Sequence, residues 1–404
     1  MRSLVALVLA GCLLAAGCGG AGGHRAAPPP PASQASGGAG AAPAGEAPRP
    51  MLAWTPSRLP AGFAARVPAL AGVRRAVAVV SGTVWLDRSL DAGGRVVDQP
   101  PAGMAIPLDL AGAVPQALAP FLPAADRDLL AALGRGEAVL GATSARLRRL
   151  GPGGTLRMGA AVGSAQRTLR VAAVVADQDL GGHELLVSRR AAAMLGQTID
   201  RYLLVEPAPG TPWQALAGRI RALLPRGARL RIRGPGQATW LRQGDAVLPP
   251  VMEKALLGEF AARPVPAPGG WITIDPAWVA RHIVTAPVPI LGRVTCNRAV
   301  IPQLRGALAE VDRRGLGRLV DPGDYAGCYA ARVIPGDPGP SLAHHAWGAA
   351  IDINARANPQ GLPPHQDPRL VAVFERWGFT WGGRWLVPDG MHFELLSPRS
   401  PRPS

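Results

Sequence analysis

The sequence predicts an α+β protein whose C-terminal domain packs helices on an antiparallel sheet, preceded by a separate mixed α/β domain. Three observations support this. Residues 350–354 and 391–395 alternate apolar and polar positions, as half-buried strands do. Residues 301–311 and 367–378 carry apolar side chains at helical spacing. Between residues 137 and 175, a strand, a helix and two further strands follow one another.

The N-terminus carries a short apolar run after Arg2, which ends at Leu14–Cys18. This run is too short to cross a bilayer, which takes about 20 apolar residues. It resembles a bacterial lipoprotein signal. The resemblance implies that residues 1–17 are removed and that Cys18 is lipidated. Cys12 fits the same pattern after a shorter apolar stretch and remains the alternative.

Residues 18–52 consist mostly of Gly, Ala, Pro and Ser and lack the large apolar groups that folding requires. We predict a disordered tether there. No later segment has the length and apolar purity of a transmembrane helix. We therefore expect an exported protein that a lipid holds on the extracytoplasmic face of the cell membrane.

The net charge of +16 and the pI of about 11.3 raise the question of nucleic-acid binding. Lys254 is the single lysine, so arginine supplies nearly all of the positive charge, and the arginines form no nucleic-acid motif. We expect no nucleic-acid partner. An anionic cell wall fits an exported basic protein better.

Residues 53–263 are predicted as the mixed α/β domain. A hairpin over 76–86 turns at Ser81–Gly82, and residues 137–175 hold the strand–helix–strand–strand series. This series resembles the extracytoplasmic core domain of MacB- and FtsX-type transporter permeases, which implies an envelope protein partner. His183 is isolated and the acidic residues are scattered, so we expect no catalytic site there. An adaptor role and a plain spacer role both remain open.

Residues 264–270 are rich in Pro and Gly and predict a linker. In the domain that follows, residues 271–397, the first helix buries four apolar side chains and stops near Gly315, and the second begins at the cap Asp367 and ends at Gly378. The four side chains are Ile301, Leu304, Leu308 and Val311. Residues 398–404 are a tail.

Two cysteines, Cys296 and Cys328, lie in this domain. In an exported protein we expect them to form a disulfide. They lack histidines at zinc-finger spacing, which argues against a second metal site.

His345, Asp352 and His392 are the predicted ligands of a catalytic zinc ion, since such a site takes three imidazole or carboxylate ligands and leaves one position to water. The strand alternation turns Asp352 and His392 to one cleft, while Met391 and Phe393 point inward. Asp389 is the predicted acid/base and Arg332 the predicted cation for developing charge or a substrate carboxylate.

Other side chains near these motifs have less specific expected positions. His344 is expected behind the ligand or in solvent. Glu394 shares the strand face of His392, and holding an arginine is the alternative role for it. Three tryptophans are close in sequence to the site and could form the cleft wall, although each is more readily explained as a core residue: Trp347, Trp381 and Trp385.

The pattern His345-x-x-Gly-x-Ala-x-Asp352, followed by Asp389-x-x-His392, resembles the zinc D-alanyl-D-alanine carboxypeptidases of the VanY and VanX type. The resemblance covers roughly residues 270–397 and implies the same ligands, acid/base and arginine. In one departure, Ala343 stands where the family usually has Ser, and Ser341 lies two residues further back.

From this resemblance we expect a zinc peptidase that acts on peptidoglycan stem peptides, removing the terminal D-Ala. Two alternatives stay open. One is an endopeptidase that cuts an internal bond such as L-Ala-D-Glu. The other is a non-catalytic domain that binds wall peptides for an envelope transporter.

Overall fold

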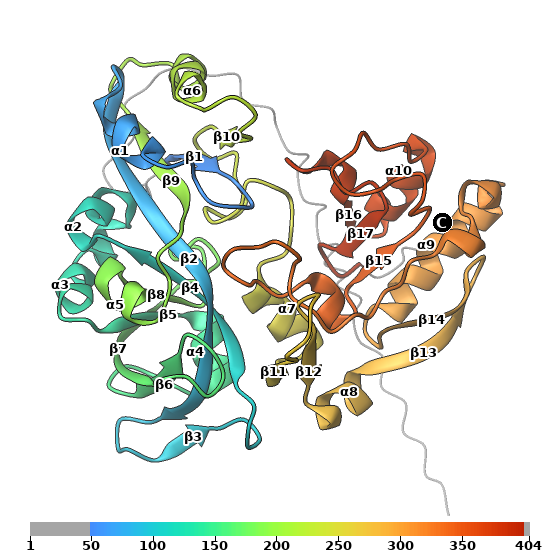
Figure 1. The fold of residues 1–404 in the computed structure, drawn as a ribbon, viewed down its shortest axis with the longest axis horizontal. Helices are drawn as coiled ribbons and strands as arrows, with labels where there is room; N and C mark the ends of the chain where they lie inside the picture. Colours follow the sequence, from blue (N-terminus) through green and yellow to red (C-terminus); the bar gives the residue numbers. More distant parts are fainter. Residues whose placement is uncertain (1–48, 400–404) are drawn as a thin grey trace, which may run out of the picture. The chain divides into compact units, whose positions relative to one another are not determined.

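A ten-stranded mixed sheet is the largest element of the computed structural model, which describes residues 49–399. Figure 1 shows this sheet, whose strands follow the order β10-β1-β9-β2-β4-β8-β5-β7-β6, with β3 beside β2. β4 pairs with β8 and β5 with β7 in parallel. The predicted mixed α/β region is therefore confirmed. The strands are β1 (Met51–Trp54), β2 (Val73–Leu90), β3 (Val96–Asp98), β4 (Ile106–Ala113), β5 (Ala138–Gly141), β6 (Thr155–Gly159), β7 (Arg167–Val175), β8 (Leu185–Ser188), β9 (Asp200–Pro207) and β10 (Arg231–Arg233).

The helices of this part are short, apart from α6. They are α1 (Phe63–Arg66), α2 (Pro115–Leu118), α3 (Leu129–Gly134), α4 (Ala142–Arg148), α5 (Arg189–Met194), α6 (Trp213–Ala222) and α7 (Pro250–Leu257), with 3-10 turns η1 (Val67–Ala69), η2 (Ala119–Phe121) and η3 (Ala124–Asp126). The predicted series over 137–175 is confirmed by β5, α4, β6 and β7.

The hairpin predicted at Ser81–Gly82 is wrong, because β2 continues through both residues. Ser81 pairs with Ala111, and Gly82 pairs with Leu110. A Cβ atom at position 82 would lie 1.9 Å from the side-chain oxygen of Gln197. Glycine is therefore required here because the Gln197 side chain packs closely against the strand, and not because the chain turns.

Charged side chains gather inside this part, contrary to the prediction of scattered acids and an isolated histidine. Glu184 lies 3.1 Å from Arg148 and 2.6 Å from Lys254, and all three are buried. His183 Nδ1 lies 2.8 Å from Asp109, and its Nε2 lies 3.0 Å from the Tyr202 hydroxyl. The partners come from distant segments, which local patterns cannot reveal.

The predicted linker connects two paired strands, β11 (Ala262–Pro264) and β12 (Ile272–Ile274). All described residues belong to one compact unit, and the predicted domain bounds stay a prediction. α8 (Pro276–His282) and the hairpin of β13 (Ile283–Val288) and β14 (Gly292–Asn297) follow.

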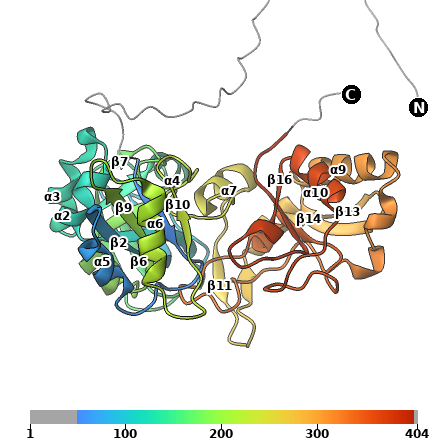
Figure 2. The same ribbon diagram turned by 90° about the horizontal axis from the view of Figure 1, so that it is seen from above.

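The C-terminal part packs helices on a three-stranded antiparallel sheet, as predicted. β15 (Ala350–Asp352) and β16 (Phe379–Trp381) flank β17 (His392–Leu395). α9 (Ile301–Arg313) and α10 (Pro368–Arg376) lie beside one another (Figure 2). Both predicted helices are confirmed, including the Asp367 cap, which accepts a hydrogen bond from the Arg369 N–H. The 3-10 turns are η4 (Gly317–Leu319), η5 (Pro322–Asp324), η6 (His344–Trp347) and η7 (Gly382–Arg384).

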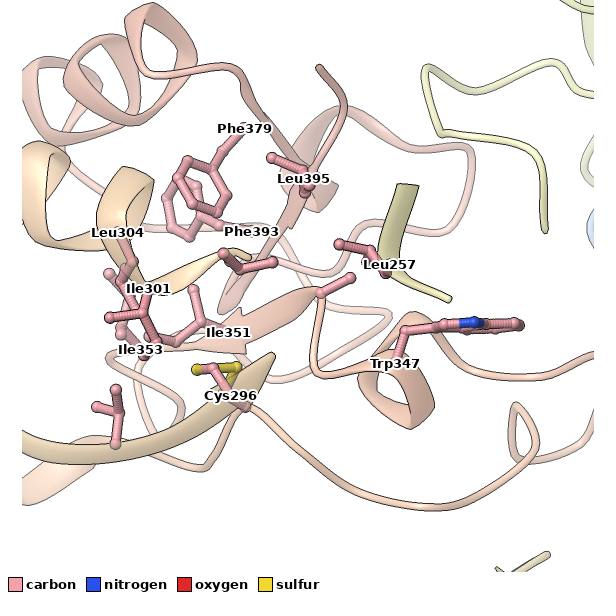
Figure 3. Close-up of a cluster of buried hydrophobic side chains, with 14 of the residues drawn as sticks. Leu257, Cys296, Ile301, Leu304, Trp347, Ile351, Ile353, Phe379, Phe393 and Leu395 are labelled. Atoms are coloured by element: carbon pink, nitrogen blue, oxygen red, sulfur yellow. A yellow bond between two sulfur atoms is a disulfide. The ribbon is translucent and has the colours of Figure 1, made fainter. Parts of the chain in front are cut away.

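One hydrophobic cluster fixes the strands that carry the candidate site. Ile351, Ile353 and Phe393 are at most 1% exposed and pack with residues of α9 (Figure 3). Because side chains alternate along a strand, burying this face turns Asp352 and His392 to the other side.

None of the helices in residues 49–399 is long and apolar enough to cross a membrane. The signal peptide, most of the tether, Cys12, Cys18 and residues 400–404 lie outside the described residues.

Candidate metal and peptidase site

The three predicted ligand side chains converge on one point. His345 Nε2 lies 3.2 Å from both His392 Nδ1 and an oxygen of Asp352, and His392 Nδ1 lies 3.0 Å from the other Asp352 oxygen. Within residues 49–399, no other group of three or more His, Cys, Asp or Glu side chains brings its donor atoms within 4.8 Å of one another.

Local backbone structure holds these side chains in place. Asp352 and His392 are direct partners across the β15–β17 ladder, and His345 lies in η6. η6 ends at Gly348, with φ of 64°, where an added Cβ would lie 2.6 Å from the Asn297 nitrogen. Only glycine allows this turn to approach β14 so closely.

The spacing of the donors fits zinc. In a tetrahedral site with bonds of about 2.0–2.1 Å, neighbouring donor atoms lie about 3.3 Å apart. The distances of 3.0–3.2 Å between His345, Asp352 and His392 are close to that value. Two imidazoles and a carboxylate also make the donor set of a catalytic zinc site. These residues could hold zinc, and their ligand role stays a prediction.

In both histidines, the ring nitrogen that faces away from the other two predicted ligands has a polar partner of its own. His345 Nδ1 donates to the Cys328 carbonyl oxygen at 2.7 Å, and His392 Nε2 lies 3.0 Å from Glu394 Oε2. Such partners fix which nitrogen faces a metal ion. Glu394 therefore holds His392 and not an arginine.

A proton and a zinc ion would compete for His392, so the pKa of this side chain predicts how zinc affinity depends on pH. Burial alone would lower the pKa of His392, but hydrogen bonds to Asp352 and Glu394 raise it to about 10. At neutral pH a metal ion must therefore displace a proton, and affinity falls as pH falls. We expect zinc affinity to rise about tenfold per pH unit between about pH 6 and 8.

Chelator competition measures this slope, and calorimetry in buffers of different ionisation enthalpy counts the released protons, with about one expected. A zinc affinity that is constant over this pH range would contradict the prediction.

Asp389 lies beside the three ligands without a hydrogen-bond partner for one oxygen. It is 8% exposed, and its Oδ1 forms no hydrogen bond within residues 49–399. Its backbone N–H donates to Gly382 at 2.9 Å, which fixes the turn before His392. Burial raises the pKa of the Asp389 carboxyl, although His392 opposes this. A carboxyl group in this state suits proton transfer near neutral pH.

Arg332 lines the same cavity of about 130 Å³ as the ligands and Asp389. Within the described part of the chain, Arg332 forms no ion pair with a carboxylate. The structure therefore brings together all five predicted site residues. The remaining wall is formed by Ile334, Pro335, Ala343, His344, Gln360, Trp385, Met391 and Glu394.

One prediction about the wall is wrong, and the alternatives for the tryptophans are now decided. Met391 lines the cavity and does not point into the core, because it precedes the first residue of β17. Of the three tryptophans, Trp385 lines the cavity, whereas Trp347 is fully buried in the hydrophobic cluster and Trp381 packs against it.

The predicted disulfide between Cys296 and Cys328 is present, joining β14 to the segment whose carbonyl holds His345. Its two cysteines are 32 residues apart. Replacing both by alanine should lower the free energy of unfolding by about 3–4 kcal/mol, because the unfolded chain gains loop entropy. Urea unfolding of the two proteins measures the difference. An unchanged free energy would show that the bond contributes no stability.

Glu253 is a further side chain behind the site, and the sequence did not predict it. Its Oε1 lies 3.0 Å from His344 Nδ1, which is itself 3.3 Å from Glu394 Oε2. Burial would lower the pKa of His344, but Glu253 and Glu394 raise it to about 9. No signal could have identified Glu253, since it lies in α7, far in sequence from the motif.

Comparison with known proteins finds one family match, in the C-terminal segment. Residues 337–395 match the family model described as D-alanyl-D-alanine carboxypeptidase. The match includes His345, Asp352, Asp389 and His392, whereas Arg332 lies just before it. No curated protein matches.

Two solved structures are similar to the middle region. One is the periplasmic region of MacB from Actinobacillus actinomycetemcomitans, with 14% sequence identity and a TM-score of 0.28. The match covers 43% of this chain and 82% of the MacB chain. The other is the extracellular domain of the noncanonic ABC-type transporter YknZ from Gram-positive bacteria, with 11% sequence identity and a TM-score of 0.28. That match covers 44% of this chain and 92% of the YknZ chain. The resemblance in the C-terminal motif is confirmed, and the family match supports a peptidase function for this region.

Proposed function

We propose that the chain is a zinc-dependent peptidase that removes the terminal D-Ala from peptidoglycan stem peptides. One observation carries this proposal: three predicted ligand side chains share one cavity with a buried carboxyl and an arginine, and within residues 49–399 one oxygen of that carboxyl has no hydrogen-bond partner and the arginine has no ion pair. The family match over residues 337–395 supports the same chemistry.

His345, Asp352 and His392 would hold the zinc ion. When bound, zinc lowers the pKa of a water molecule to about 7 and polarises the substrate carbonyl. Asp389 is placed to take the proton of the attacking water and to return it to the leaving amine. Its unpartnered Oδ1 leaves an acceptor free for this proton.

Arg332 favours a carboxypeptidase over an endopeptidase. A carboxypeptidase must bind the free carboxylate at the end of its substrate, and guanidinium binds carboxylates with two parallel hydrogen bonds. Arg332 forms no ion pair within the described residues, so its guanidinium group is available for a substrate carboxylate. The cavity of about 130 Å³ has room for a small terminal residue.

Incubating the purified full chain with zinc and muropeptides tests the reaction, with products identified by mass spectrometry. Loss of one D-Ala from pentapeptide stems is the expected result. A new free terminus from cleavage of the L-Ala-D-Glu bond would identify an endopeptidase. Binding of muropeptides without any cleavage would leave the non-catalytic alternative.

We also propose that the protein is exported and lipid-anchored through Cys18, with residues 18–52 as a tether to the cell wall. The apolar run that ends at Cys18 supports this. Detergent-phase partitioning should be lost in a Cys18→Ser variant. Partitioning that survives Cys18→Ser and is lost with Cys12→Ser would move the anchor to Cys12. The domain bounds and an envelope partner for residues 53–263 remain proposals of the same kind.

A further inference from the structure

Glu253 is a buried carboxylate outside the segment that matches the peptidase family. It lies on α7, has 0% exposure, and neither of its oxygens forms a hydrogen bond within the described chain. Its close polar neighbour is His344 Nδ1, at 3.0 Å. Burying a carboxylate with so few partners costs several kcal/mol. A residue kept at that cost in this place needs a reason.

A series of ion pairs joins Glu253 to the metal site, although His344 Nδ1, which lies between Glu253 and Glu394, forms no hydrogen bond within residues 49–399. His344 Nδ1 also lies 3.3 Å from Glu394 Oε2, and the same oxygen lies 3.0 Å from His392 Nε2. The opposite nitrogen of His392 faces His345 and Asp352. Every member has a side chain no more than 13% exposed, so water screens these contacts little.

Glu253 does not line the cavity, which ends at His344 and Glu394. It therefore cannot touch a substrate or a metal ion held there. Any effect on the site passes through the two side chains in between.

The middle region holds α7 in place. The next residue, Lys254, projects to another side of the helix, where its Nζ lies 2.6 Å from Glu184. Leu257, one turn on, belongs to the hydrophobic cluster that contains Ile351 and Phe393. The helix is thus fixed to both the middle region and the sheet of the candidate site.

We propose that Glu253 is a positioning residue of the metal site, which orients His392 through His344 and Glu394. This inference rests on the proposed function. It also assigns a role to the middle region, whose helix α7 supplies the outermost carboxylate of the site. Outer partners of metal-binding histidines fix the ring and raise its basicity, and their loss weakens metal binding.

The test compares Glu253→Gln with Leu257→Ala in the full chain. Glu253→Gln keeps the size and removes the charge, whereas Leu257→Ala removes packing on the same helix and keeps the carboxylate. Chelator competition should show zinc affinity about tenfold lower in Glu253→Gln. The visible absorption spectrum of the cobalt(II)-substituted protein should shift as well. Leu257→Ala should lower the Tm and change zinc affinity and the cobalt spectrum much less than Glu253→Gln does, because the carboxylate remains.

A second variant separates positioning from folding. His344→Gln breaks the same series of ion pairs, so it should weaken zinc binding to a similar degree. The double variant should lose little more than either single variant, since both act through one path. If Glu253→Gln does not fold, Glu253→Leu with the same readouts replaces it, because it removes the charge together with the buried polar group, and a wild-type zinc affinity there would contradict the proposal.

The outcomes are distinguishable. A wild-type protein that binds no zinc would overturn the proposed function and this inference together. A wild-type protein that binds zinc, with unchanged affinity and cobalt spectrum in Glu253→Gln, would overturn this inference alone.

Discussion

Replacing Asp389 by asparagine should lower kcat/KM on pentapeptide stems by about 10²–10⁴-fold, the usual contribution of a general acid/base. Asparagine keeps the size of the side chain and cannot take a proton from water. Asp389 is not among the three converging donors, so zinc affinity should stay within a few-fold of wild type. The expected result is a folded, zinc-loaded and nearly inactive protein.

The matched control for this variant is Asp312→Asn, which changes an exposed aspartate of α9. It should retain wild-type kinetics. Steady-state kinetics and chelator competition on both variants measure the effect. Full activity of Asp389→Asn would remove Asp389 from the mechanism and leave the metal site intact.

Replacing His392 by alanine should abolish both zinc binding and hydrolysis. Loss of an outer partner alone weakens metal binding 10–100-fold, so loss of a ligand should exceed about 100-fold. The change also removes the ring that pairs with both Asp352 and Glu394. Leaving each buried carboxylate without this partner should lower the free energy of unfolding by about 1–3 kcal/mol. The Tm of the zinc-free protein should therefore fall too.

The control variant is His365→Ala. His365 lies in the same C-terminal segment, is exposed and does not line the cavity. It should bind zinc and cleave stems like the wild type. Because His392→Ala is destabilising, its zinc affinity is measured below its Tm, with circular dichroism confirming the fold. Wild-type zinc affinity of a folded His392→Ala protein would mean that His392 is not a ligand.

The C-terminal elements were predictable because local sequence fixes them. The apolar spacing of Ile301, Leu304 and Leu308 and the cap at Asp367 correctly predicted α9 and α10. The alternation around Ile351 and Phe393 correctly predicted which face is buried, and so that Asp352 and His392 share the other face. The alternation misplaced Met391, because it assumed one residue more of strand than the structure has.

The middle region was less predictable. Ser81–Gly82 has the composition of a turn, yet Gly82 lies inside β2 because Gln197, more than a hundred residues away, leaves no room for a Cβ. Likewise His183 looks isolated until the sheet brings Asp109 and Tyr202 to it.

Short spacings and simple counting were enough to predict the residue types of the candidate site, the faces of the strands that carry them and the pairing of the two cysteines. The side chains that stand behind the predicted ligands are known only from the packed fold. Glu253 and the Cys328 carbonyl reach the histidines from segments far away in the sequence, and such contacts depend on packing, which no local pattern records. Glu394 is the local case, because it lies two residues from His392 on β17.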